Sequence, residues 1–186
     1  MDLALLFLVL SPPVVALGLL KYRADYRRHG HTTVLGFWAV CLAFLMPHLV
    51  LGYAFPMVWV PHTLFEQVCF GIMVAGLLGC LWPLRHFSAN MWTGRRQPHL
   101  VTSGPYRYSR NPQYVTYFLL LFGYALLGRT PLAWIALAEY WVVVHLIVLI
   151  EEEHLERRFG DVYRDYKRRT PRYVGVPKGG SGSAAA

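Results

Sequence analysis

The stretch YVTYFLLLFGYALLGRTPLAWIALAEYWVVVHLIVLI, residues 114–150, holds two apolar runs separated by a short turn around Arg129-Thr130. The second run, Pro131–Ile150, has 20 residues and is long enough to cross a bilayer as a helix. The first run, Tyr114–Gly128, has 15 residues and would span about 22 Å, so one of its ends should be recessed. A connection this short predicts a helical hairpin, with residues 114 and 150 at the same end.

Three further apolar blocks precede this hairpin, at residues 3–20, 33–55 and 64–84. Hydrophobic residues make up 55% of the 186-residue chain. This pattern predicts an all-α integral membrane protein with about five transmembrane helices. The first block lacks a basic start, which favours a retained span over a cleaved signal peptide. Pro12-Pro13 should bend or break its helix.

The basic residues lie almost entirely on one predicted side of the membrane. With five spans, the segments after the first, third and fifth spans share a face, and 17 of the 18 Lys and Arg residues lie there; Arg129 is the exception. The positive-inside rule makes this face cytoplasmic and puts the N-terminus outside. The net charge of +8 therefore indicates topology rather than a nucleic-acid partner.

No metal site is predicted from the cysteine and histidine pattern. Cys41, Cys69 and Cys80 all lie within predicted spans and lack the spacing of metal ligands. They are interpreted as small apolar packing residues. The eight histidines are scattered, and none of them forms a His-x-x-x-His pair.

The polar stretch GPYRYSRNPQY, residues 104–114, leads into the hairpin. Asn111 is predicted to cap the helix by accepting a backbone hydrogen bond, and Pro112 suits the first turn. The loop would bring Tyr106 and Arg110 to a helix N-terminus, which attracts anions. The alternative is an ordinary capped helix whose arginines meet lipid phosphates.

Three consecutive carboxylates, Glu151–Glu153, follow the second run at the same predicted end of the hairpin. Their position at a helix C-terminus opposes the helix dipole, which favours cations there. Either Arg157 and Arg158 neutralise them, or they bind a cation. With the anion-attracting loop beside them, they predict a site for a zwitterion with an amino-acid head.

Two stretches, HLVTSGPYRYSRNPQY (99–114) and EEEHLERRFGDVYRDYKRRTPRYV (151–174), resemble a known enzyme family. They are similar to the integral-membrane isoprenylcysteine carboxyl methyltransferases and the related phospholipid methyltransferases, over about residues 85–175. The resemblance implies that S-adenosylmethionine binds at the cytoplasmic face, between the last two spans, the loop before them and the C-terminal tail. The implied cofactor-binding residues are His99, Leu100, Val101, Tyr106, Arg110, Asn111, Pro112, Tyr114 and Glu151.

The sequence departs from the family pattern at two positions. Asn111 stands where family members have His, so it can form hydrogen bonds but cannot relay a proton. Ile147 stands one turn before the acidic pair, where prenylcysteine-methylating members have an Arg for the substrate carboxylate. If this position alone excludes carboxylates, Ile147→Arg should introduce or improve activity on a prenylcysteine analogue. The sequence does not reveal the methyl acceptor.

His145 and Glu152 are the candidate catalytic residues. Ionisable groups within a span are costly and indicate function, and these two, seven residues apart, share one helical face. A neutral amine or hydroxyl acceptor would need such a base, whereas a carboxylate or thiolate would not. The alternative role for His145 is a hydrogen bond to a neighbouring helix.

The chain is predicted to comprise N-terminal membrane helices (1–84), a C-terminal methyltransferase half (85–176) and a flexible linker-like tail (177–186). Apolar residues between Leu155 and Tyr166 recur with helical spacing, which predicts a helix on the membrane surface that could also close over the site. The predicted function is S-adenosylmethionine-dependent methylation of a lipophilic acceptor that enters from the bilayer.

Two other functions are compatible with parts of this pattern. An NADPH-dependent reductase of the sterol-reductase kind has a similar Asn-Pro-x-Tyr motif, but the acidic run would repel dinucleotide phosphates. A non-enzymatic membrane scaffold would carry the same motifs only as surface features of its helices.

Overall fold

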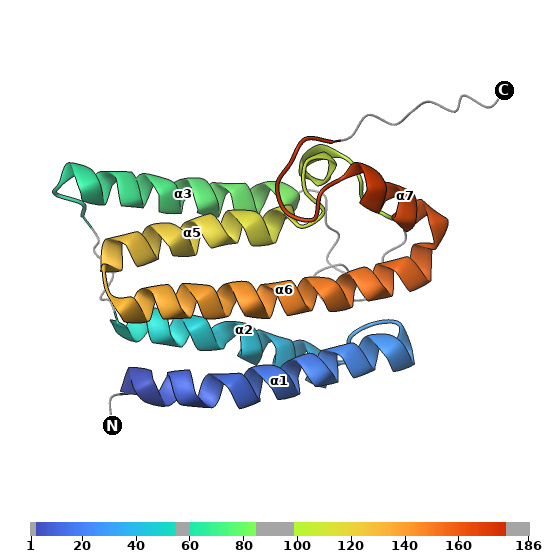
Figure 1. The fold of residues 1–186 in the computed structure, drawn as a ribbon, viewed down its shortest axis with the longest axis horizontal. Helices are drawn as coiled ribbons and strands as arrows, with labels where there is room; N and C mark the ends of the chain where they lie inside the picture. Colours follow the sequence, from blue (N-terminus) through green and yellow to red (C-terminus); the bar gives the residue numbers. More distant parts are fainter. Residues whose placement is uncertain (1–2, 55–59, 85–98, 178–186) are drawn as a thin grey trace.

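The computed structural model describes residues 3–54, 60–84 and 99–177 (Figure 1). These residues form long helices that lie side by side in an elongated bundle, and no strand occurs among them. The helices are α1 (Leu3–His29), α2 (Val34–Ala54), α3 (Leu64–Leu84), α5 (Pro112–Gly128), α6 (Pro131–Phe159) and α7 (Asp161–Arg169), with a short 3-10 helix η1 (Gly104–Arg107).

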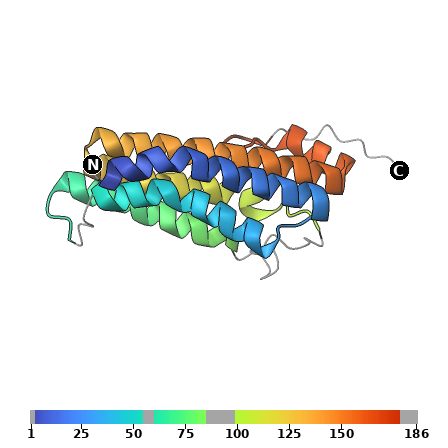
Figure 2. The ribbon, with the colours of Figure 1, turned by 90° about the horizontal axis from the view of Figure 1, so that it is seen from below.

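The five long helices alternate in direction along the bundle, and Figure 2 shows the same arrangement from below. α1 packs on α2 and α3 packs on α5, while α6 contacts α1, α2 and α5. The start of α5, the end of α6, η1 and α7 therefore gather at one end of the bundle. The predicted hairpin of residues 114–150 is confirmed as α5 and α6.

The buried side chains concentrate around α6, which has two apolar faces. On one face, Tyr140, Val144 and Val148 are fully buried in a cluster that includes residues of α5. On the other face, Val143 and Ile147 pack with residues of α1 and α2. A helix that is apolar on both faces lies at the centre of the fold.

Two described helices are long and apolar enough to span a membrane: Leu64–Trp82 within α3, and α6. A shorter apolar helical segment covers Val34–Leu49 in α2. Large hydrophobic side chains on α3, such as Leu64, Leu78 and Trp82, are more than half exposed. Such an apolar surface suits a lipid environment. All five predicted spans are helices, while their crossing of the membrane and its orientation stay predictions.

Two details of the helices differ from the sequence-based expectation. α1 continues through Pro12 and Pro13 to His29, so the expected break at these prolines is wrong. Both prolines are exposed, which keeps their rings out of the packed interface with α2. α6 continues beyond Ile150 to Phe159, because its polar last turns make ion pairs with neighbouring segments.

Candidate functional site

A small cavity of about 80 Å³ lies at the end of the bundle where α5 begins and α6 ends. Its walls come from η1, α5, α6, α7 and the residues just before η1. The lining residues are Leu100, Val101, Tyr106, Arg110, Asn111, Gln113, Glu151, Glu152, Leu155, Tyr163 and Tyr166.

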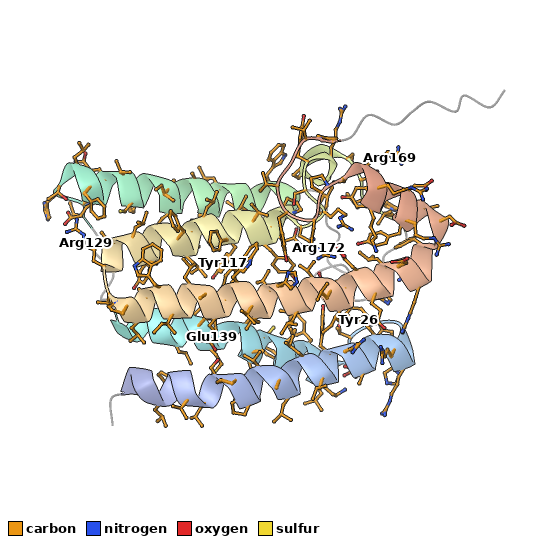
Figure 3. All side chains as sticks on the ribbon, in the orientation of Figure 1. Tyr26, Tyr117, Arg129, Glu139, Arg169 and Arg172 are labelled. Atoms are coloured by element: carbon orange, nitrogen blue, oxygen red, sulfur yellow. The ribbon has the colours of Figure 1, made fainter. Side chains whose placement is uncertain are left out.

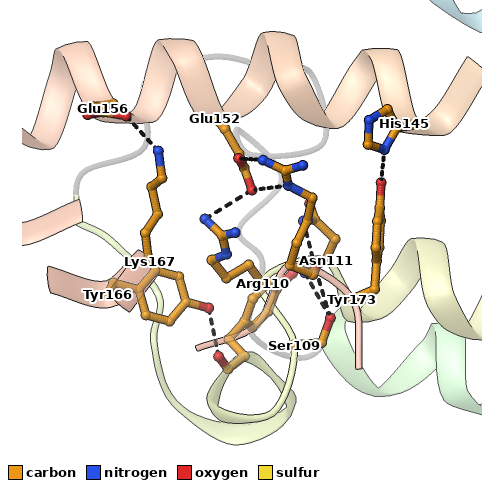
Figure 4. Close-up of polar contacts among 11 residues, drawn as sticks. Ser109, Arg110, Asn111, His145, Glu152, Glu156, Tyr166, Lys167 and Tyr173 are labelled. Atoms are coloured by element: carbon orange, nitrogen blue, oxygen red, sulfur yellow. Dashed lines mark hydrogen bonds and ion pairs between the residues drawn. The ribbon is translucent and has the colours of Figure 1, made fainter. Parts of the chain in front are cut away.

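Asn111 precedes the first residue of α5, as predicted, but its side chain does not cap the helix. The Nδ2 amide donates to the carbonyl of Arg172 at 3.1 Å, and the backbone N–H of Asn111 donates to Ser109 Oγ at 3.0 Å (Figure 4). The predicted capping bond is therefore wrong, because this amide is used to hold the C-terminal segment. The next residue, Pro112, has no N–H to satisfy in any case.

Arg110 and Arg172 both pair with Glu152, and Figure 4 shows Arg110 directed at this carboxylate. Arg110 Nη1 lies 3.0 Å from Glu152 Oε1, and Arg172 donates to both carboxylate oxygens, at 3.1 and 2.8 Å. The Glu152 side chain is only 7% exposed. The contacts with two guanidinium groups offset the cost of burying this carboxylate. The Glu152 interaction in turn raises the pKa of Arg172.

Glu153 forms ion pairs with a different group of arginines. It accepts hydrogen bonds from Arg23 and Arg27 of α1 and from Arg157, one turn later on α6. Successive residues on a helix point about 100° apart. The predicted neutralisation by nearby arginines is therefore correct for Glu153, at the bundle surface, and involves α1 as well.

Glu151 is the carboxylate of the run that has no cationic partner among the described residues. Its Oε1 accepts hydrogen bonds from the hydroxyls of Tyr22 on α1, at 2.9 Å, and Tyr114 on α5, at 3.1 Å. The Tyr22 hydroxyl also lies 3.2 Å from that of Tyr26. The carboxyl group of Glu151 thus faces the cavity within a ring of phenols.

The tail covers the cavity through two tyrosines of α7. The Tyr166 hydroxyl donates to the carbonyl of Tyr106 at 2.6 Å, and Tyr163 is almost fully buried. Burial raises the pKa of both phenols, and also that of Tyr106, where the charge of Glu151 adds to the effect. These tyrosines therefore stay neutral over the physiological pH range.

The structure brings together most of the predicted site residues. Seven of them line the cavity: Leu100, Val101, Tyr106, Arg110, Asn111, Glu151 and Glu152. Tyr114 is connected to the cavity through its hydrogen bond to Glu151. His99 is exposed and Pro112 is buried, and neither of them lines the cavity. His145 lies outside it as well, hydrogen bonded through Nδ1 to the Tyr173 hydroxyl at 2.7 Å.

Several residues of the site were missed by sequence reasoning. Tyr22 comes from α1, 129 residues before its partner Glu151, and no local pattern links the two. Gln113 accepts a hydrogen bond from the Tyr106 hydroxyl at 3.1 Å. The helical spacing of Tyr163 and Tyr166 in the tail was the one signal that could have placed them on the inner face.

Ile147 does not face the cavity. It is 3% exposed and packs with Val15, Leu19 and Val143 between α1 and α6. This packing disfavours the expectation that Ile147→Arg introduces a carboxylate site. An arginine there would be buried without a partner and would destabilise the bundle.

Nine of the eleven cavity-lining residues fall within a segment that matches a known protein family, and Tyr163 and Tyr166 lie just beyond its end. The model of the phospholipid methyltransferase family matches residues 68–162, just over half of the chain. The chain belongs to this family. The matched segment runs from α3 to α7, so it contains the hairpin, the loop before it and the acidic run.

Three curated relatives match parts of the chain at low identity. The nickel-cobalt-cadmium resistance protein NccN of Alcaligenes xylosoxydans xylosoxydans is 29% identical over 75% of this chain and 63% of its own length. The cobalt-zinc-cadmium resistance protein CzcN of Cupriavidus metallidurans is 28% identical over 75% of this chain and 62% of its own length. The protein-S-isoprenylcysteine O-methyltransferase of Schizosaccharomyces pombe is 33% identical over 49% of this chain and 39% of its own length.

The chain thus spans less than two thirds of the length of these family relatives. No solved structure matches it. Among the residues that the structure describes, no group of three or more His, Cys, Asp or Glu side chains is arranged to hold a metal ion.

Proposed function

We propose that this protein is an integral-membrane methyltransferase that uses S-adenosylmethionine and methylates a lipophilic acceptor. The observation that carries the proposal is Glu151, a carboxylate that faces a cavity without a cationic partner among the described residues. An incoming cation would stabilise the charged form of this buried carboxyl group. S-adenosylmethionine carries two cationic groups, an ammonium and a sulfonium.

The residues at the cavity also fit the anionic end of the cofactor. Arg110 Nε is buried and has no hydrogen-bond acceptor among the described residues, so the guanidinium retains a donor for a carboxylate. Ligand pockets for whole small molecules measure about 300–1,000 Å³, whereas this cavity has about 80 Å³. Glu151 and Arg110 would thus hold the amino-acid head of the cofactor, at the inner end of a larger site.

When bound, the cofactor supplies an activated methyl group for in-line displacement. The contribution of the chain is positioning and exclusion of water. The ion pairs of Glu152 with Arg110 and Arg172 fix the cavity wall in one geometry. His145, proposed as the base for a neutral acceptor, would act two helical turns from Glu152, at the bond to Tyr173.

The location of the site supports the proposed cellular orientation. The cavity lies at the end of the bundle that carries α7 and its basic last turn, Lys167, Arg168 and Arg169. Basic segments beside membrane helices favour the cytoplasmic face. The lipophilic acceptor would then enter from the bilayer, while the cofactor would enter from the cytoplasm.

A calorimetric titration of the detergent-purified protein with S-adenosylhomocysteine and, separately, with NADPH tests this function. Binding of S-adenosylhomocysteine but not NADPH is expected, because Glu151 and Glu152 would repel dinucleotide phosphates. Binding of NADPH alone would favour a reductase. Binding of neither ligand would favour a non-enzymatic role and contradict the proposal.

A further inference from the structure

A second hollow lies on the outside of the α5–α6 hairpin and is distinct from the cavity. This groove has a volume of about 550 Å³, within the range of pockets that bind small molecules. Its walls include Phe118 and Leu119 of α5, Trp134, Leu137 and Trp141 of α6, and Tyr173 of the C-terminal segment. Apart from the Tyr173 hydroxyl and the indole N–H groups, these side chains are apolar.

One end of the groove is polar. The Tyr173 ring lies 4.6 Å from the Trp141 ring, and its hydroxyl bonds to His145, one turn after Trp141 on α6. The preceding residue, Arg172, binds Glu152 in the cavity wall. The short segment at residues 172–173 therefore joins the end of the groove to the wall of the cavity.

We infer that this groove binds the hydrocarbon chain of the methyl acceptor, with the reacting head group at the His145–Tyr173 pair. The inference rests on the proposed function and assigns a binding site to the methyl acceptor. The groove runs along α6, which is long and apolar enough to span a membrane, so a lipid chain can enter from the side. A polar head would then stop at His145, roughly 10 Å along α6 from Glu152.

The inference also accounts for the position of His145. This side chain is absent from the cavity lining and is held instead by Tyr173. At the polar end of the groove it can orient the head group and accept a proton from a neutral acceptor. The apolar walls would select the acceptor by chain length, because each buried methylene favours binding.

Photolabelling in phosphatidylcholine nanodiscs tests the groove. The probe is palmitic acid with a diazirine in its chain, and adducts are mapped by mass spectrometry on peptides containing Phe118 and Trp141. Wild-type protein should give a higher adduct yield there than at Leu78, a lipid-facing position on α3. An equal yield at the three positions would overturn the inference, because it would show only bulk lipid contact.

Variants that fill the groove provide the second arm. Ala138→Phe, in the groove wall, should lower the yield at Phe118 and Trp141 about tenfold, because the new ring displaces two or more methylenes of the probe. Val174→Trp narrows the groove from its exposed rim and should act in the same direction without disturbing helix packing. Val142→Phe, exposed on α6 outside the groove, is the matched control and should label like wild type.

S-adenosylhomocysteine titrations of the same proteins separate the two proposals. The inference is supported if wild type and all three variants bind S-adenosylhomocysteine equally, while photolabelling falls only in Ala138→Phe and Val174→Trp. Equal binding with unchanged labelling overturns the groove assignment while the proposed function stands. If no protein binds S-adenosylhomocysteine, the proposed function fails, and the assignment of an acceptor site fails with it.

Discussion

At the scale of single residues, the run Glu151–Glu153 shows how three identical side chains acquire different surroundings. Glu153 meets surface arginines, Glu152 is held by two arginines, and Glu151 meets only tyrosine hydroxyls among the described residues. The helical rotation between neighbours separates them. The charge pattern alone predicts an acidic site at this point, and only the family resemblance singles out Glu151 for the cofactor.

This difference predicts unequal effects of neutralising Glu151 and Glu153. Glu151→Gln should weaken S-adenosylhomocysteine binding at least about 30-fold, because a buried ammonium would lose its charged partner. Glu153→Gln, whose side chain is 27% exposed, should change the affinity less than about threefold. Isothermal titration of both variants is the measurement, and similar losses in both would argue against this role for Glu151.

Asn111 gives a second prediction at this scale. Asn111→Leu removes the donor to the Arg172 carbonyl, and we expect it to cost about 1–3 kcal/mol of stability. Asn111→His retains a ring N–H and should lose less. Thermal unfolding in detergent compares the two variants, and wild-type stability in Asn111→Leu would show that this bond does not hold the C-terminal segment.

At the scale of helices, α3 and α5 approach closely through glycines. A Cβ added at Gly76 would lie 2.4 Å from the backbone N of Leu120 and 2.8 Å from the carbonyl of Thr116. Small residues allow this kind of contact between membrane helices, where packing replaces the hydrophobic effect. The apolar runs predict these helices well, whereas the packing partner of each glycine depends on contacts far apart in the sequence.

The close approach predicts that Gly76→Ala destabilises the protein by about 1–3 kcal/mol, through a forced shift of the α5 backbone. Gly71→Ala, on the same helix but with open space at its Cβ, should be neutral or slightly stabilising. Thermal unfolding of both variants in the same detergent provides the comparison. Equal transition temperatures would refute the tight α3–α5 contact.

At the scale of the whole molecule, the fold follows from the alternation of apolar runs and polar segments. Five runs and one basic side predict five helices whose directions alternate, and the structure contains them in this order. Figure 3 shows Arg129 at one end of the bundle and Arg169 and Arg172 toward the other. The sequence predicts a tail helix that could close over the site, but it does not identify the bond from Tyr166 to Tyr106, because these residues lie 60 positions apart.

Membrane topology can be tested with single cysteines at opposite ends of the bundle. In a background without Cys41, Cys69 and Cys80, Val162→Cys on α7 and Val60→Cys before α3 are exposed positions. A membrane-impermeant maleimide should label residue 60 in intact cells and residue 162 only in inverted vesicles. Labelling of both positions from one side would contradict the five-span arrangement.

The central claim, methyl transfer at the membrane, is tested most directly in proteoliposomes. Purified protein is incubated with S-adenosylmethionine carrying a labelled methyl group, and the label is counted in the organic extract. The account predicts transfer by wild type, strongly reduced transfer by Glu151→Gln, and near-normal transfer by Glu153→Gln. Undiminished transfer by Glu151→Gln, or no transfer to any of a panel of lipid amines, thiols, phenols and prenylcysteines, would contradict it.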